Sequence, residues 1–112
     1  AWTGDEVGYR LRPERYTSHL KRLLEAWPAS HVLIHGFGWS EAFAGKAGLE
    51  GFTSSLRTYL HEIRRRHPDA GIVLMLPANQ PREMAGTLPG QPAPHLRAYA
   101  AAMKQTAAEA GV

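Results

Sequence analysis

The chain has 112 residues, of which 44% are hydrophobic and 21% are charged, as in one small globular domain. The absence of cysteine excludes disulfides, thiolate metal ligands and thiol redox chemistry, and the longest apolar run, residues 72–78, is too short to span a bilayer. The formal net charge is +3 and the basic residues are spread out apart from positions 64–66, so we expect neither a nucleic-acid nor a membrane partner.

The first predicted elements are a helix over residues 13–26 and a strand over residues 31–34. The helix is predicted because apolar side chains recur at the spacing of one helix face: Tyr16, Leu20, Leu23, Leu24 and Trp27. Pro28 ends this pattern. The strand is predicted because a β-branched apolar run lies between Pro28 and two glycines.

A second helix is predicted over residues 49–66 and a second strand over residues 71–76. The helical stripe consists of Phe52, Leu56, Tyr59, Leu60 and Ile63. The arginines at 64–66 fall in the last helical turn, where cations complement the helix dipole, so we interpret them as a solvated helix end. The apolar run of the second strand is continuous, which is typical of a strand covered on both faces.

A third helix is predicted after a proline-rich loop over residues 77–94. Its stripe consists of Leu96, Tyr99, Ala100, Met103 and Ala107, and Gly111 is expected to end it. The alternation of helices and strands predicts an α/β domain with parallel strands. Two strands that are apolar on both faces leave two sheet edges unpaired. We therefore expect residues 1–112 to be a single partial domain, the middle of a larger one, that is able to self-associate through its open edges.

The stretch LIHGFGWS at residues 33–40 resembles the α/β-hydrolase fold, in which a strand ending in His-Gly-Phe-Gly supplies an oxyanion-hole amide. That family also needs a Gly-x-Ser-x-Gly nucleophile elbow further along the chain. No such pentapeptide follows here. The nearest match, GWSEA at residues 38–42, would require the loop that supplies the oxyanion-hole amide to carry the nucleophile as well. This resemblance is therefore the weaker alternative.

Four blocks in order resemble the SGNH, or GDSL-like, hydrolase superfamily. They are AWTGDEV at residues 1–7, GWSEAFAGKAGLEGF at 38–52, RRRHPDAGIVLMLPANQP at 64–81 and LPGQPAPHLRAYAAAMKQTAAEAGV at 88–112. The resemblance implies a three-layer α/β/α sandwich with a parallel sheet, the flavodoxin-like SGNH fold, of which this chain is an incomplete part. It also implies hydrolysis of small-molecule or carbohydrate acyl esters, O-acetyl esters among them, with no cofactor and no metal.

In this superfamily a serine attacks the acyl carbonyl, a histidine acts as the base, and preorganised donors hold the oxyanion. The resemblance assigns two of these donors to this chain: the amide of Gly4 and the side chain of Ser40, which stands where the family has asparagine. The Gly-Asp-Ser block with the nucleophile is expected before Ala1, and the Asp-x-x-His block after Val112. We therefore expect the chain by itself to be inactive.

A second alignment of the chain with this superfamily is also open. The stretch TGDEVGYR at residues 3–10 resembles a Gly-Asp-Ser block in which Glu6 replaces the serine. That alignment would require the deletion of a strand and of the second block before residue 31. Truncation at both ends is the preferred interpretation.

Several neighbouring residues have two interpretations each. Ser40 is either an oxyanion donor or a cap on the turn after the strand. Glu41 is either an acid or base or, as we favour, the residue that fixes the loop. Trp2 and Trp39 either border an acyl pocket or, as we favour, pack beside glycine turns. Asp5 is expected to brace its own turn.

His31 and His35 flank the predicted strand and do not form a metal pair. On a strand they stand roughly 13 Å apart, too far for one ion to bind both. A less favoured alternative places His35 beside Ser40 as a base, in the manner of a triad.

Two functions of different classes follow from these patterns. The first is an ester hydrolase whose nucleophile and base lie outside the chain. The second is a binding module that kept the scaffold of the family but lost its catalytic groups. The acyl group, the leaving group and the compartment are left open by the sequence.

Overall fold

The computed structural model describes residues 6–10, 32–78 and 93–112. In chain order these residues form α1 (Val7–Arg10), β1 (Val32–Gly36), the 3-10 helix η2 (Glu41–Gly48), α4 (Leu49–Arg66), β2 (Gly71–Met75) and α5 (Ala93–Glu109). The predicted helix over residues 13–26 and most of the proline-rich loop lie outside the described residues. The helix over 49–66 and the strand over 71–76 are confirmed, the strand ending one residue earlier than predicted.

The two strands pair in parallel, with Val32 opposite Gly71 and Gly36 opposite Met75. Parallel strands need a long crossover connection, which η2 and α4 supply. The prediction of an α/β fold with parallel strands is therefore confirmed. Because both strands run in the same direction, their carboxyl ends meet at one edge, beside the loop that begins at Phe37.

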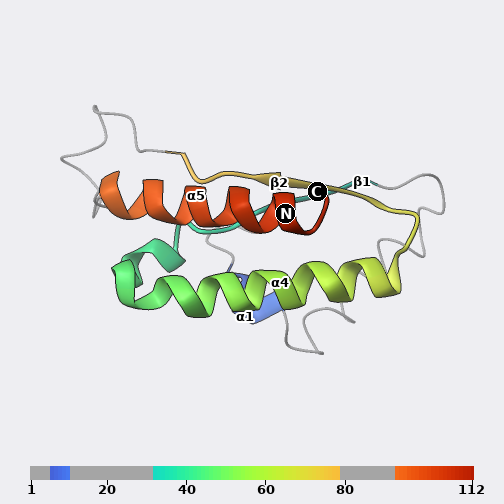
Figure 1. Ribbon diagram of the computed structural model, residues 1–112, viewed down its shortest axis with the longest axis horizontal. Coiled ribbons are helices and arrows are strands. Elements are labelled where there is room, and N and C mark those ends of the chain that lie inside the picture. The colour runs from blue at the N-terminus through green and yellow to red at the C-terminus, as the bar shows by residue number, and fades with distance from the viewer. Residues whose placement is uncertain (1–5, 11–31, 79–92) are drawn as a thin grey trace.

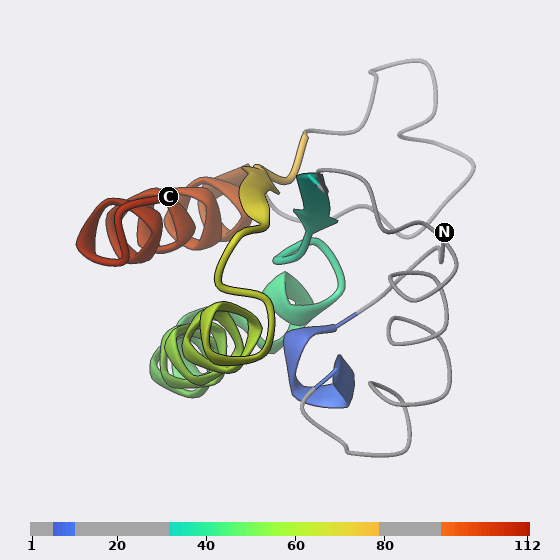
Figure 2. The same ribbon diagram turned by 90° about the vertical axis from the view of Figure 1, so that its right-hand side faces the viewer.

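The two long helices, α4 and α5, lie side by side on the same side of the strands (Figures 1 and 2). Near their starts, the rings of Phe52 and Tyr99 are 5.0 Å apart. Near their ends, the Arg64 guanidinium donates to the carbonyl of Gly111 at 2.9 Å. These contacts at both ends show that the helices run in the same direction.

The core lies mainly between α4 and α5. The helical stripes predicted from the sequence supply most of its buried side chains, and α1, η2 and the loop after β1 supply the others. The buried apolar residues are Val7, Phe37, Ala42, Phe52, Leu56, Tyr59, Leu60, Ile63, Leu96, Tyr99 and Met103. The interpretation of residues 64–66 as an exposed basic helix end is confirmed, and two of these arginines pair with Glu62.

The end of α5 is a Schellman motif. The N–H of Gly111 donates to the carbonyl of Ala108 at 3.2 Å, and that of Val112 donates to the carbonyl of Ala107 at 2.9 Å. Gly111 has a φ of +69°, and Val112 packs against the core. The prediction that Gly111 ends the helix is confirmed.

The two faces of the sheet differ in what the described residues place against them. Ile72 and Leu74 pack against the core, whereas four apolar side chains on the outer face are 45% to 61% exposed: Val32, Ile34, Val73 and Met75. The described residues therefore cover the second strand on one face only, and the cover predicted for its other face is not among them. A continuous apolar run determines that a strand forms, but it does not determine what lies against each face.

Within the described ranges, the sheet and the helices on one side of it form two layers (Figure 2). No helix in this part of the chain combines the length and the apolar character needed to cross a membrane.

Candidate functional site

The candidate site lies in the loop after β1, at the carboxyl end of the strand, which is where ligands bind in open α/β sheets. Ser40 stands directly before η2, and its backbone carbonyl accepts the N–H of Phe43 at 3.2 Å. Its side chain makes no capping hydrogen bond. Ser40 therefore occupies the N-cap position of η2, but the interpretation of its side chain as a cap is wrong.

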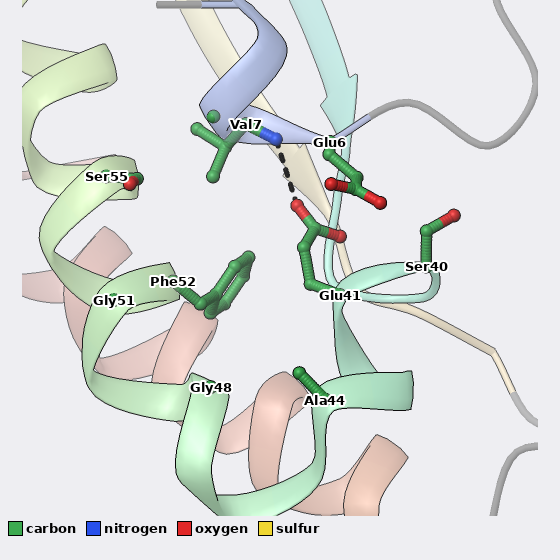
Figure 3. A pocket seen from close by; sticks show the side chains of 10 residues that line it. Glu6, Val7, Ser40, Glu41, Ala44, Gly48, Gly51, Phe52 and Ser55 are labelled. Carbon is green, nitrogen blue, oxygen red and sulfur yellow. Dashed lines mark hydrogen bonds between the residues drawn. The ribbon is translucent and has the colours of Figure 1, made fainter.

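The carboxylate of Glu41 ties two separate segments together. Its Oε2 accepts the backbone N–H of Gly38 at 2.7 Å, within the same loop. Its Oε1 accepts the backbone N–H of Val7 at 2.9 Å, from a segment 34 residues earlier (Figure 3). Hydrogen bonds to an ionised acceptor are stronger than neutral ones. Glu41 thus fixes the loop, as predicted, and also holds the start of α1 against it.

Burial changes the ionisation of this carboxyl group. Desolvation raises the pKa of Glu41 above its ordinary value of 4.5, and the nearby charge of Glu6 acts in the same direction. The hydrogen bonds from Val7 and Gly38 lower the pKa but do not cancel the effect of burial. The folded chain therefore binds the Glu41 proton more tightly than the unfolded chain does.

This pKa shift predicts the sign of a pH effect on stability. The contribution of Glu41 to the free energy of unfolding should decrease as pH rises from 4.5 through the folded-state pKa of Glu41, and then stay level. Glu41→Gln should lack this decrease. It should also destabilise the chain by about 1–3 kcal/mol, because an amide can accept only one of the two N–H groups.

Urea unfolding of both proteins between about pH 4 and about pH 8 measures both effects. The titration of the Glu41 side-chain carbon by NMR provides an independent check. A midpoint at or below 4.5 would contradict the expected direction of the shift.

Helix α5 holds the far end of η2 through Tyr99. The buried Tyr99 hydroxyl donates to the carbonyl of Gly45 at 2.9 Å. Gly45 has φ 60° and ψ −154°, a conformation essentially limited to glycine, and it interrupts the helical geometry of η2. Burial, with a contribution from the charge of Glu41, raises the pKa of Tyr99, so the hydroxyl keeps its proton at neutral pH.

A cavity of about 270 Å³ lies between α1, η2 and the first turns of α4. Its polar walls are Glu6, Ser40, Glu41 and Ser55. Glu6 and Ser40 lie on the same side as Glu41, whereas Ser55 projects from α4 on the opposite side (Figure 3). The remaining lining is small or apolar and consists of Val7, Gly8, Ala44, Gly48, Gly51 and Phe52. Two carboxylates and two hydroxyl-bearing residues therefore line one small open space.

The structure describes one of the two predicted oxyanion donors. Ser40 lines the cavity, whereas Gly4 lies outside the described residues. Trp2, Asp5 and His31 also lie outside them. Glu6 and Val7, the first described residues after Gly4, line the cavity.

Trp39 and His35 pack among other aromatic side chains. The Trp39 ring meets Phe43 edge-on, with ring centroids 5.4 Å apart, and it does not line the cavity. The favoured prediction, that Trp39 is a packing residue, is therefore confirmed. His35 stacks on Phe37, and its Nδ1 is 3.2 Å from the hydroxyl of Tyr59. His35 does not line the cavity with Ser40 either.

The wall formed by α4 was missed by sequence reasoning. Gly51 and Ser55 are four residues apart and therefore lie on one face of that helix. Two small side chains at this spacing were a weak signal of an open space beside the helix. Residue spacing alone did not indicate that the N–H of Val7 would donate to the carboxylate of Glu41.

Within the described ranges, no three or more His, Cys, Asp or Glu side chains are placed to hold a metal ion. No protein-family model, no curated protein and no solved structure matches the chain.

Proposed function

We propose that this chain is the central segment of an SGNH-type acyl hydrolase. The observation that best supports the proposal is the pair of hydrogen bonds through which Glu41 joins Val7 to Gly38. The sequence resemblance requires the block around Gly4 and the block around Ser40 to meet at one oxyanion hole. A link between the residue three positions after Gly4 and the residue next to Ser40 fits this requirement.

In the proposed reaction this chain contributes donors and not the nucleophile. The Ser40 hydroxyl and the Gly4 amide donate hydrogen bonds to the oxygen that becomes negative when the acyl carbonyl is attacked. Glu41 acts as a positioning residue, because it holds both donor-bearing segments and its oxygens already accept two N–H groups. The serine nucleophile and the histidine base belong to segments that the proposal places outside residues 1–112.

The second candidate function is a binding module without catalysis. The observation that favours it is Ser40 itself, because a serine hydroxyl reaches less far than the side-chain amide of asparagine and offers a single donor. The cavity beside Ser40 needs no nucleophile to hold a ligand.

The fold of the proposed hydrolase requires a third layer. The exposed apolar outer face of the sheet, formed by Val32, Ile34, Val73 and Met75, is the surface that such a layer would cover. The same face and the two open strand edges also support self-association of the chain on its own.

Hydrolysis of p-nitrophenyl acetate by this chain and by the parent protein that contains it distinguishes the two functions. We expect turnover by the parent protein only. In the parent protein, Ser40→Ala should lower kcat by about 10²-fold or more, with KM little changed, because a donor used in the transition state is lost. Ser54→Ala, on the exposed side of α4, is the matched control and should leave kcat unchanged.

Three results would count against parts of this proposal. Turnover by the 112-residue chain alone would show that the nucleophile has been misplaced. Full activity of Ser40→Ala would remove Ser40 from the oxyanion hole. A folded parent protein without activity on acyl esters would favour the binding module.

A further inference from the structure

The cavity beside Ser40 is kept open by two glycines. A Cβ atom added to Gly8 or Gly51 would meet no heavy atom within 4 Å, and both residues line the cavity. Gly51 lies within α4, where glycine is about 1 kcal/mol less favourable than alanine. Neither helix packing nor backbone conformation requires glycine at these two positions. Neither residue adds a side chain to the wall of the cavity.

The polar walls of this cavity consist of acidic and hydroxyl-bearing side chains. Two carboxylates, Glu6 and Glu41, line the cavity on the same side (Figure 3). Two hydroxyls, Ser40 and Ser55, add groups that both donate and accept hydrogen bonds. Such walls favour a ligand that donates hydrogen bonds and disfavour a ligand that carries a negative charge.

We infer that this cavity binds a small hydroxylated amine, with its ammonium group toward the two carboxylates and its hydroxyls toward Ser40 and Ser55. If the chain belongs to the proposed acyl hydrolase, on which this part of the inference rests, the ester that the enzyme cleaves contains an aminated polyol. Binding of the hydroxylated amine to the cavity requires no turnover.

The volume of the cavity limits the size of the ligand. At about 270 Å³ it lies just below the range of roughly 300–1,000 Å³ in which drug-sized ligands bind. One ring-sized group can therefore enter, and an extended ligand must project into solvent. A site with few hydrogen bonds and an open mouth should bind a single ring with a Kd of about 1–10 mM.

NMR titrations of the 112-residue chain with glucosamine, glucose and glucuronate test the inference. At about pH 6.5 the amine is protonated and the uronate is ionised. We expect glucosamine to shift the amide signals of Val7, Ser40 and Ser55, glucose to bind more weakly, and glucuronate to cause no saturable shift. Equal binding of all three sugars, or no binding of glucosamine, would overturn the inference.

A blocking variant locates the binding in this cavity. Gly51→Leu places a side chain in the open space and should weaken glucosamine binding by about tenfold or more without unfolding the chain. Ser54→Leu adds a similar side chain on the same helix outside the cavity lining, and it should bind as the wild type does. Equal affinity of the Gly51→Leu variant and the wild type would place the ligand elsewhere.

A charge variant tests the role of the carboxylates. Glu6→Gln should weaken glucosamine binding by about two- to fivefold, the effect of one partly exposed ion pair, and leave glucose binding unchanged. An equal loss for both sugars would contradict the charge preference. Binding of glucosamine by a parent protein that hydrolyses no acyl ester would support this inference while contradicting the proposed function, so the two can fail separately.

Discussion

Leu56→Ala is expected to destabilise the chain by about 2–5 kcal/mol. Leu56 is fully buried on α4, among the side chains that join this helix to α5. Its truncation removes apolar surface from the core and leaves a cavity that a small domain cannot fully close. Urea or thermal unfolding followed by circular dichroism gives the change in the free energy of unfolding.

The matched control for this substitution is Leu76→Ala. Leu76 follows β2 and is 48% exposed, so the same chemical change should cost less than about 1 kcal/mol. Similar losses at both positions would contradict the placement of the core between α4 and α5. The cavity should be affected together with the core, because Phe52 lines it one turn before Leu56 on the same helix.

Gly48→Ala is expected to destabilise the chain by about 1–3 kcal/mol through overpacking. A Cβ atom at this position would lie 2.6 Å from the Ala44 Cβ and 2.6 Å from the Tyr99 hydroxyl oxygen. That hydroxyl donates to the carbonyl of Gly45, so its displacement would leave a buried acceptor without its donor. The 3-10 helix η2 and the start of α4 should therefore move apart from α5.

Gly51→Ala is the matched control three residues further along. It adds the same methyl group to α4 where no atom lies within 4 Å, and it should stabilise the chain by up to about 1 kcal/mol through helix propensity. Unfolding of both variants in urea measures the difference, and amide shifts of Ser40 and Glu41 report whether the loop has moved. A Gly48→Ala variant as stable as Gly51→Ala would contradict the close approach of η2 to Tyr99.

The two substitutions differ in how directly they act on the candidate site. Leu56 stabilises the helix pair as a whole, whereas Gly48 and Tyr99 position the segment that carries Ser40 and Glu41. Amide shifts around the loop should therefore change more in Gly48→Ala than in Leu56→Ala at the same loss of stability.

The sequence by itself determined the regular elements. The stripe over residues 49–66 predicted α4 because helical periodicity can be recognised in the local sequence. The apolar side chains of the stripe are the ones that α4 buries. The apolar runs at 31–34 and 71–76 predicted β1 and β2, and Gly111 predicted the end of α5 for the same local reason. The order of these elements predicted parallel strands.

Only the tertiary structure decided how the candidate site is assembled. Glu41 meets an N–H group 34 residues away, and the geometry of η2 at Gly45 is held by Tyr99 from 54 residues away. Residue spacing along the chain does not predict these hydrogen-bond partners, because hydrogen bonds between distant segments depend on how the helices pack. For the same reason, the runs that predicted the strands could not show that one face of the sheet is exposed.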